Sequence, residues 1–175
     1  MLERQTLLVR PWAPARPPHG PAGGAEARRE VIDPATGAAL GFACWRRARG
    51  GAWGRLAPAL VLAVYEAGDE PLLCSLQRFW WFGRFWELRE ADAHRVATIR
   101  RRRITDRWGR LLAVRECRPG VGLWVARPGG EALATVTAAG DGLYLHFADT
   151  VAELPFVKMA LLAAALVVEG KPGSR

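Results

Sequence analysis

The sequence concentrates arginine, a residue type suited to binding phosphate, in one stretch near its middle. The candidate phosphate-binding residues are Arg100, Arg101, Arg102, Arg103 and Arg107. Their planar guanidinium groups can donate paired hydrogen bonds to phosphate oxygens. Each basic side chain close to an anionic lipid surface contributes about 1 kcal/mol of attraction. We therefore predict that this stretch contacts the phosphate groups of anionic phospholipids.

A competing interpretation makes the same arginines solvated charges at strand edges, where they discourage aggregation. Successive residues of a strand face opposite ways, so the run 100–103 forms one patch only if the chain turns within it. The formal charge of +8 does not decide between the two interpretations. Arginine supplies nearly all of the positive charge, and Ala, Gly and Pro are also abundant. A GC-rich genome produces that bias without selection for an acidic partner.

Aromatic residues are concentrated in residues 78–86, RFWWFGRFW. Tryptophan beside arginine is typical of a membrane interface, and the same residue types stack on single-stranded nucleic acid. In strands, aromatic residues usually fill the core. Both faces of a strand in a simple barrel cannot be core, so exposure of some of these residues is an open alternative. The candidates for membrane or partner contact are Trp80, Trp81 and Trp86.

Catalytic chemistry has little support in the sequence. The three histidines, His19, His94 and His146, lack the spacing of metal ligands. The two serines, Ser75 and Ser174, do not lie in a G-x-S-x-G nucleophile elbow. We expect a non-enzymatic protein that needs no cofactor.

The cysteines Cys44, Cys74 and Cys117 are too far apart for a C-x-x-C metal or redox pair. We interpret them as small buried side chains in a reducing compartment. The first residues carry charge and too few consecutive apolar side chains for the core of a signal peptide. We therefore expect a cytoplasmic location, with peripheral contact to a membrane if the lipid prediction holds.

Five strand–turn–strand units position the candidate residues. They cover residues 29–45, 60–76, 85–99, 104–114 and 125–136. Each unit has Gly, Pro or Asp in its turn, between segments rich in Val, Leu, Ile, Thr and aromatic residues, which is the pattern of a β-hairpin. Isolated hairpins are only marginally stable, so the set must close or stack. We predict an antiparallel meander.

Residues 155–168 are apolar on every side except at Lys158, which predicts a helix surrounded by other atoms. Pro155 suits the first turn of a helix. At about 1.5 Å per residue the helix spans roughly 20 Å, less than the ~30 Å hydrocarbon core of a bilayer. Its length favours burial inside the protein over insertion into a membrane.

The composition divides the chain into three parts. Residues 1–29 contain a short N-terminal strand and a linker rich in Pro, Gly and Ala, which has too few large apolar side chains to order itself. Residues 30–170 form the predicted barrel domain, and residues 171–175 are a tail.

Three stretches resemble a known family. They are VIDPATGAALG at residues 31–41, a strand, an aromatic stretch and a Trp-Glu-Leu strand within 72–99, and LYLHFADTVAELPFVKMALLAAALVVEG at 143–170. In order and pattern they resemble the tubby C-terminal-like superfamily, and within it the phospholipid scramblases and LURP-one-related proteins. The resemblance implies a mainly β fold: a closed antiparallel barrel of about twelve strands around a central apolar C-terminal helix. It implies phospholipid contact for some members.

Scramblase-like proteins are also associated with a calcium-binding acidic segment before the helix. The matching stretch here offers Asp149 and Glu153, with Asp141 upstream. Calcium takes six to eight oxygen ligands, so these carboxylates are weak candidates. We favour the interpretation that they are solvated loop acids, stabilised near a helix N-terminus by its dipole, and expect no metal.

The sequence favours a non-catalytic module of scramblase or LURP-one type that binds anionic phospholipid at a membrane surface. The alternative is a protein-interaction or structural module without a lipid ligand. Nucleic acid is disfavoured as a partner, because the chain has no helix-turn-helix, zinc-finger or RNP-type motif. Lipid flipping would rest on analogy with the family alone.

Overall fold

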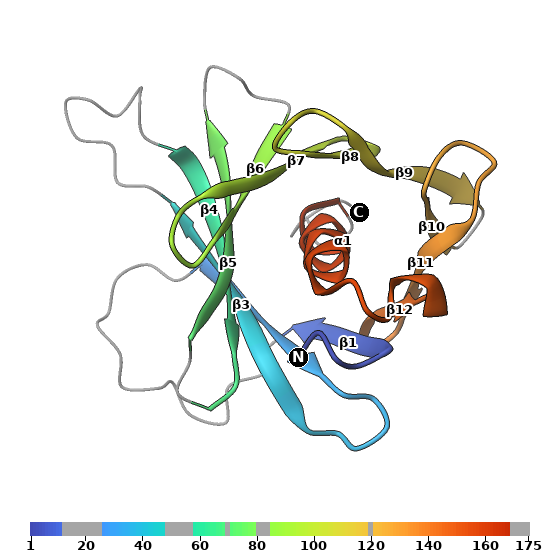
Figure 1. The fold of residues 1–175 in the computed structure, drawn as a ribbon. Helices are drawn as coiled ribbons and strands as arrows, with labels where there is room; N and C mark the ends of the chain where they lie inside the picture. Colours follow the sequence, from blue (N-terminus) through green and yellow to red (C-terminus); the bar gives the residue numbers. More distant parts are fainter. Residues whose placement is uncertain (12–25, 48–57, 69–70, 80–84, 119–120, 169–175) are drawn as a thin grey trace.

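The computed structural model describes residues 1–11, 26–47, 58–68, 71–79, 85–118 and 121–168. In this part of the chain, twelve antiparallel strands follow one another around a closed barrel, and the first strand pairs with the last (Figure 1). The strands are β1 (Thr6–Pro11), β2 (Glu26–Ile32), β3 (Ala39–Arg47), β4 (Pro58–Glu66), β5 (Leu72–Phe79), β6 (Phe85–Glu90), β7 (Arg95–Arg100), β8 (Arg103–Asp106), β9 (Leu111–Arg118), β10 (Val121–Val125), β11 (Ala132–Ala139) and β12 (Gly142–Phe147). A short 3-10 helix, η1 (Asp149–Val151), and the helix α1 (Pro155–Val168) complete the described chain.

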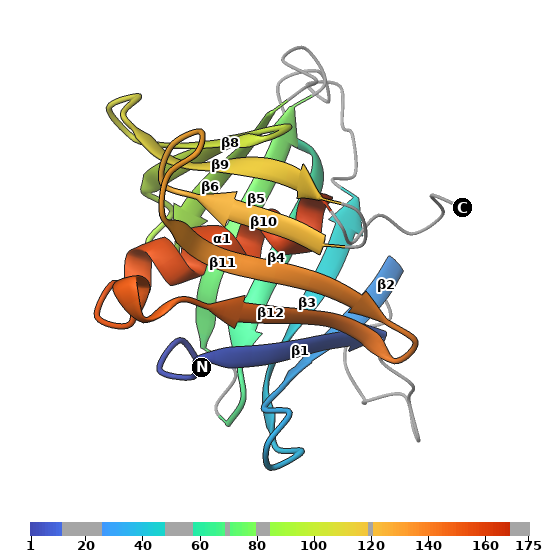
Figure 2. The same ribbon diagram turned by 90° about the vertical axis from the view of Figure 1, so that its right-hand side faces the viewer.

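Helix α1 runs through the inside of the barrel, which confirms the predicted central helix (Figures 1 and 2). Every residue from Lys158 to Val167 is buried. The helix has no polar face because the wall surrounds it on all sides. Large wall side chains such as Trp124 and Phe147 are fully buried in the same core.

Lys158 is the charged residue of α1, and it is only 2% exposed. Its Nζ donates a hydrogen bond to the backbone oxygen of Leu2 at 3.0 Å. The same nitrogen lies 5.5 Å from the ring centre of Phe147. A carbonyl oxygen and an aromatic face therefore replace the water that a buried ammonium group loses.

The five predicted hairpins are present, and their loops lie at one end of the barrel. They join β2 to β3, β4 to β5, β6 to β7, β8 to β9 and β10 to β11. Because the strands alternate in direction, these loops share the end at which η1 precedes α1, as Figure 2 shows for the β8–β9 and β10–β11 loops. The turns between β7 and β8 and between β11 and β12 lie at the opposite end.

Strand β1, which lies in the predicted N-terminal part before residue 30, belongs to the wall of the barrel. Strand β1 pairs with β12 on one side and with β2 on the other, so it closes the barrel. Strand β2 starts inside the predicted linker. There Arg29 pairs with Pro11 of β1, so pairing between the strands orders this residue without a large apolar side chain. Residues 12–25 of that linker lie outside the described residues.

Alternation along β7 and β8 decides which side chains reach the outer surface. Ala97 and Ile99 of β7 and Ile104 of β8 belong to the buried core. Their neighbours in sequence therefore face outward. This places the side chains of two threonines and two arginines on the outer wall: Thr98, Arg100, Arg103 and Thr105.

Candidate functional site

The predicted arginine run lies at a hairpin turn. Arg100 ends β7, Arg103 begins β8, and the two residues pair directly across the ladder. Arg101 has a φ of 40°, a left-handed backbone conformation that reverses the chain within two residues. Arg100 and Arg103 consequently face the same side of the sheet. The chain therefore turns within the run, as it must if the four arginines are to form a single patch.

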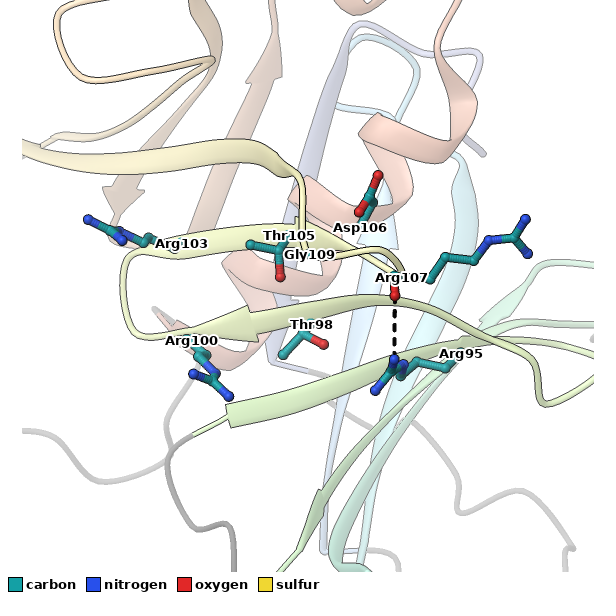
Figure 3. A pocket seen from close by; sticks show the side chains of 8 residues that line it. All are labelled: Arg95, Thr98, Arg100, Arg103, Thr105, Asp106, Arg107 and Gly109. Carbon is teal, nitrogen blue, oxygen red and sulfur yellow. Dashed lines mark hydrogen bonds between the residues drawn. The ribbon is translucent and has the colours of Figure 1, made fainter.

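A hollow of about 370 Å³ lies on the outer wall beside this turn (Figure 3). Its lining residues are Arg95, Thr98, Arg100, Arg103, Thr105, Asp106, Arg107 and Gly109. Thr98 and Thr105 pair across β7 and β8 and lie between the arginines of the two ends. The hollow thus brings together three of the five predicted phosphate-binding residues. Arg101 and Arg102 are exposed in the adjoining turn.

The arginines of the hollow differ in their partners. Arg95 donates from Nη2 to the backbone oxygen of Arg107 at 3.4 Å, and its Nη1 lies 3.9 Å from Oε1 of Glu87. The guanidinium carbon of Arg100 lies 5.1 Å from the ring centre of Phe85. Within the described chain, Arg100, Arg103 and Arg107 form no ion pair with a carboxylate. Among the described residues, no carboxylate is therefore close enough to neutralise their positive charge.

Asp106 is the acidic residue among the described lining of the hollow, and its carboxylate already has a structural task. Its Oδ1 accepts hydrogen bonds from the backbone N–H groups of Trp108 at 2.9 Å and Arg110 at 2.8 Å. Those bonds hold the β8–β9 turn, where Gly109 has a φ of 84°. The four guanidinium groups and the one carboxylate of the lining sum to three net positive charges, and Glu87 lies outside the lining beside one of those groups, that of Arg95.

This arrangement can bind an oxyanion. Guanidinium groups on several sides can each donate charge-assisted hydrogen bonds to phosphate oxygens. The hydroxyl groups of Thr98 and Thr105 can donate to the same anion from the floor. The described lining includes no histidine or cysteine that could act as general base or nucleophile.

Trp86 is the predicted aromatic anchor that the structure describes, and it does not line the hollow. Trp86 is half-buried, packs against the core and meets Trp45 edge-to-face, with ring centres 5.7 Å apart. The guanidinium carbon of Arg78 lies 5.8 Å from the ring centre of Trp86. Trp80 and Trp81 lie outside the described residues. Among the three, the structure therefore places only Trp86, and it places that residue in the wall.

The weak calcium candidates do not come together. Asp141 lies in the β11–β12 turn and accepts a hydrogen bond from the hydroxyl of Tyr144 at 3.0 Å. Asp149 lies beyond the other end of β12 and accepts one from Gln5, while Glu153 is exposed just before α1. In the described part of the chain, no three His, Cys, Asp or Glu side chains gather closely enough to hold a metal ion.

The thiols that the structure describes are buried in the wall. Cys44 and Cys74 are 2% and 1% exposed. Burial raises the pKa of the Cys74 thiol to about 12, so it stays protonated at neutral pH and is a poor nucleophile. The side chain of Cys117 lies outside the described part.

Sequence reasoning missed Trp108, at the tip of the β8–β9 hairpin. Its side chain is 67% exposed, and the guanidinium carbons of Arg107 and Arg110 lie 4.0 Å and 5.8 Å from its ring centre. The signal was available: a tryptophan directly before the glycine of a tight turn projects beyond the strands that could cover it. Arg95 lies outside the predicted arginine run, and the pairing of β7 with β8 brings it to the hollow.

Among the described residues, no helix has both the length and the apolar character needed to cross a bilayer. Comparisons of the chain with protein-family models, with curated proteins and with solved structures give no match.

Proposed function

We propose that this protein is a non-catalytic module that binds anionic phospholipid head groups at a membrane surface through the arginine-lined hollow. The observation that carries the proposal is the set of four arginines around two threonine hydroxyls, with a single carboxylate that is engaged in a turn. We also propose that the chain is a scramblase or LURP-one type member of the tubby-like superfamily. A closed barrel around a central apolar helix is the architecture that this resemblance implied.

The position of the hollow supports a surface ligand. It lies on the outer wall, and the exposed Arg101 and Arg102 extend its positive charge along the turn. At about 1 kcal/mol for each basic group near an anionic surface, four arginines correspond to roughly a thousandfold preference for anionic over neutral vesicles at low salt. Salt weakens this preference, because the Debye length falls to about 8 Å at physiological ionic strength.

Flotation of the protein with vesicles tests the proposal. Vesicles of phosphatidylcholine alone are compared with vesicles that also contain phosphatidylserine, at low and at physiological salt. The double variant Arg100→Ala/Arg103→Ala loses two basic groups of the hollow, and we expect roughly thirtyfold weaker binding to the anionic vesicles.

A matched control separates the hollow from net charge. The double variant Arg10→Ala/Arg127→Ala removes the same charge from exposed positions outside the hollow, so we expect it to bind like the wild type. Equal losses in both double variants would mean that charge alone attracts the protein. A wild type that ignores anionic vesicles at low salt would overturn the proposal.

One observation favours a second candidate, a protein-interaction module without a lipid ligand. Trp108 is exposed between two arginines, and Trp and Arg are enriched among the residues that dominate protein–protein affinity. This candidate predicts that vesicles leave the protein unbound while a protein partner protects Trp108 from solvent.

A further inference from the structure

The β8–β9 hairpin carries an apolar tip on a basic wall. Among the described residues, the large hydrophobic side chains that are exposed are Trp108, Leu111 and Leu154. Two of these, Trp108 at 67% and Leu111 at 43% exposure, flank the same turn. Leu154 lies directly before α1 and does not belong to this hairpin.

The tip and the hollow share residues. Arg107 lines the hollow, and its guanidinium carbon also lies 4.0 Å from the ring centre of Trp108. Leu111 pairs with Thr105, which forms part of the floor. A surface that contacts the tip is therefore next to the hollow.

We propose that Trp108 is the interfacial anchor of this protein: its indole ring enters the head-group region of an anionic bilayer and holds the β7–β8–β9 wall against the lipid phosphates. This inference rests on the proposed function and adds the face by which the protein docks. Strand β8 has four residues, about 13 Å at the usual rise of a strand. The arginine turn at one end of β8 and Trp108 at the other can thus touch the same surface.

The surroundings of Trp108 fit a bilayer interface better than a protein partner. A stable protein interface buries about 800 Å² on each side around a desolvated apolar centre, and the tip offers only the two exposed apolar side chains for such a centre. Here two apolar side chains are surrounded by arginines: Arg107 and Arg110 at the tip, with Arg95 beside them. Tryptophan with flanking arginine suits the membrane interface, where the indole ring occupies the head-group level and guanidinium groups reach phosphates.

Two measurements on the full chain test the anchor, with the same phosphatidylcholine/phosphatidylserine vesicles. The first is the partition coefficient of Trp108→Ala beside Leu154→Ala, which removes an exposed side chain that does not belong to the hairpin. We expect about tenfold weaker partitioning for Trp108→Ala and no change for Leu154→Ala. Because Trp108 is largely exposed, we expect both variants to keep the wild-type melting temperature.

The second measurement is quenching of tryptophan emission by brominated acyl chains. The wild type is compared with Trp108→Phe, so that the difference in emission belongs to Trp108. We expect binding to vesicles with brominated acyl chains to lower the part of the emission that belongs to Trp108. An unquenched difference, or a Trp108→Ala variant that partitions like the wild type, would overturn the anchor. The proposed function would then still stand if Arg100→Ala/Arg103→Ala loses binding, whereas a wild type that binds no anionic vesicle would overturn both.

Discussion

Whether an arginine of this protein is available to a ligand depends on its nearest acidic neighbour. Arg10 lies 3.1 Å from Oε2 of Glu30, and Arg89 lies 2.8 Å from Oε2 of Glu87. Arg103 and Arg107 have no such carboxylate within the described chain. The same residue type therefore occurs in two settings, and three of the four arginines that line the hollow, Arg100, Arg103 and Arg107, are of the second kind within the described chain.

The ionisation of Asp33 is linked to the fold. Its carboxylate is buried in the β2–β3 turn, and its Oδ1 accepts a hydrogen bond from the backbone N–H of Ala35 at 2.9 Å. That hydrogen bond is the main cause that lowers the pKa of Asp33 below its ordinary value of 3.8, with Arg4 also contributing. Burial acts in the opposite direction.

The lowered pKa predicts a pH-dependent contribution to stability. The folded state favours the ionised form, so the stabilisation is complete above the unfolded value of 3.8 and is lost as the pH falls through the lower folded pKa. We expect Asp33→Asn to be less stable than the wild type at neutral pH. The urea midpoints of the two proteins should converge in acid, and a difference that stays constant into acid would contradict this assignment.

At the scale of elements, two hairpins have the same turn built from different residues. In the β8–β9 hairpin, the backbone oxygen of Asp106 accepts a hydrogen bond from the N–H of Gly109, and the backbone N–H of Asp106 donates one to the backbone oxygen of Arg110. In the β6–β7 hairpin, Glu90 makes the same pair of backbone bonds with Ala93 and His94. Both third loop residues have positive φ, 84° for Gly109 and 67° for Ala93. Ala93 therefore occupies a position that favours glycine.

The comparison predicts opposite effects for two exchanges. Ala93→Gly relieves about 1–2 kcal/mol of left-handed strain and makes the unfolded chain more flexible by about 0.4–1 kcal/mol. We expect a net gain of about 0.5 kcal/mol in the free energy of unfolding. Gly109→Ala, the reverse exchange in the matched turn, should lose about 1 kcal/mol or more. Urea unfolding measures both, and a loss of stability in Ala93→Gly would contradict the argument.

The hairpins were predictable because their turn residues are local signals, and α1 because an apolar segment without a polar face must be enclosed. The hollow was not predictable in the same way. Its turn contains Arg101 at positive φ, where glycine or asparagine would have marked a hairpin. Thr98 and Thr105 become its floor only through the register of β7 against β8. Residue types thus indicated phosphate binding, while the assembly of the site depends on pairing between strands.

At the scale of the whole molecule, one seam differs from all others. Each strand pairs with the strand next to it in sequence, except that β1 also pairs with β12, joining Leu7 to Leu145. Closing this seam removes the exposed edges that an open sheet would present. It also seals the wall around α1, where Lys158 donates to the backbone oxygen of Leu2 beside β1.

Contacts between residues far apart in sequence carry the largest loop-closure entropy, so we expect the seam to form after the rate-limiting step of folding. Leu7 and Leu88 are both fully buried, but Leu88 lies in the local β5–β6–β7 meander. Each exchange to Ala should lower the free energy of unfolding by about 2–5 kcal/mol. In stopped-flow experiments, Leu7→Ala should mainly speed unfolding, while Leu88→Ala should also slow folding. A Leu7→Ala variant that folds as slowly as Leu88→Ala would place closure of the seam before the transition state. The barrel would then enclose its helix early instead of being sealed last.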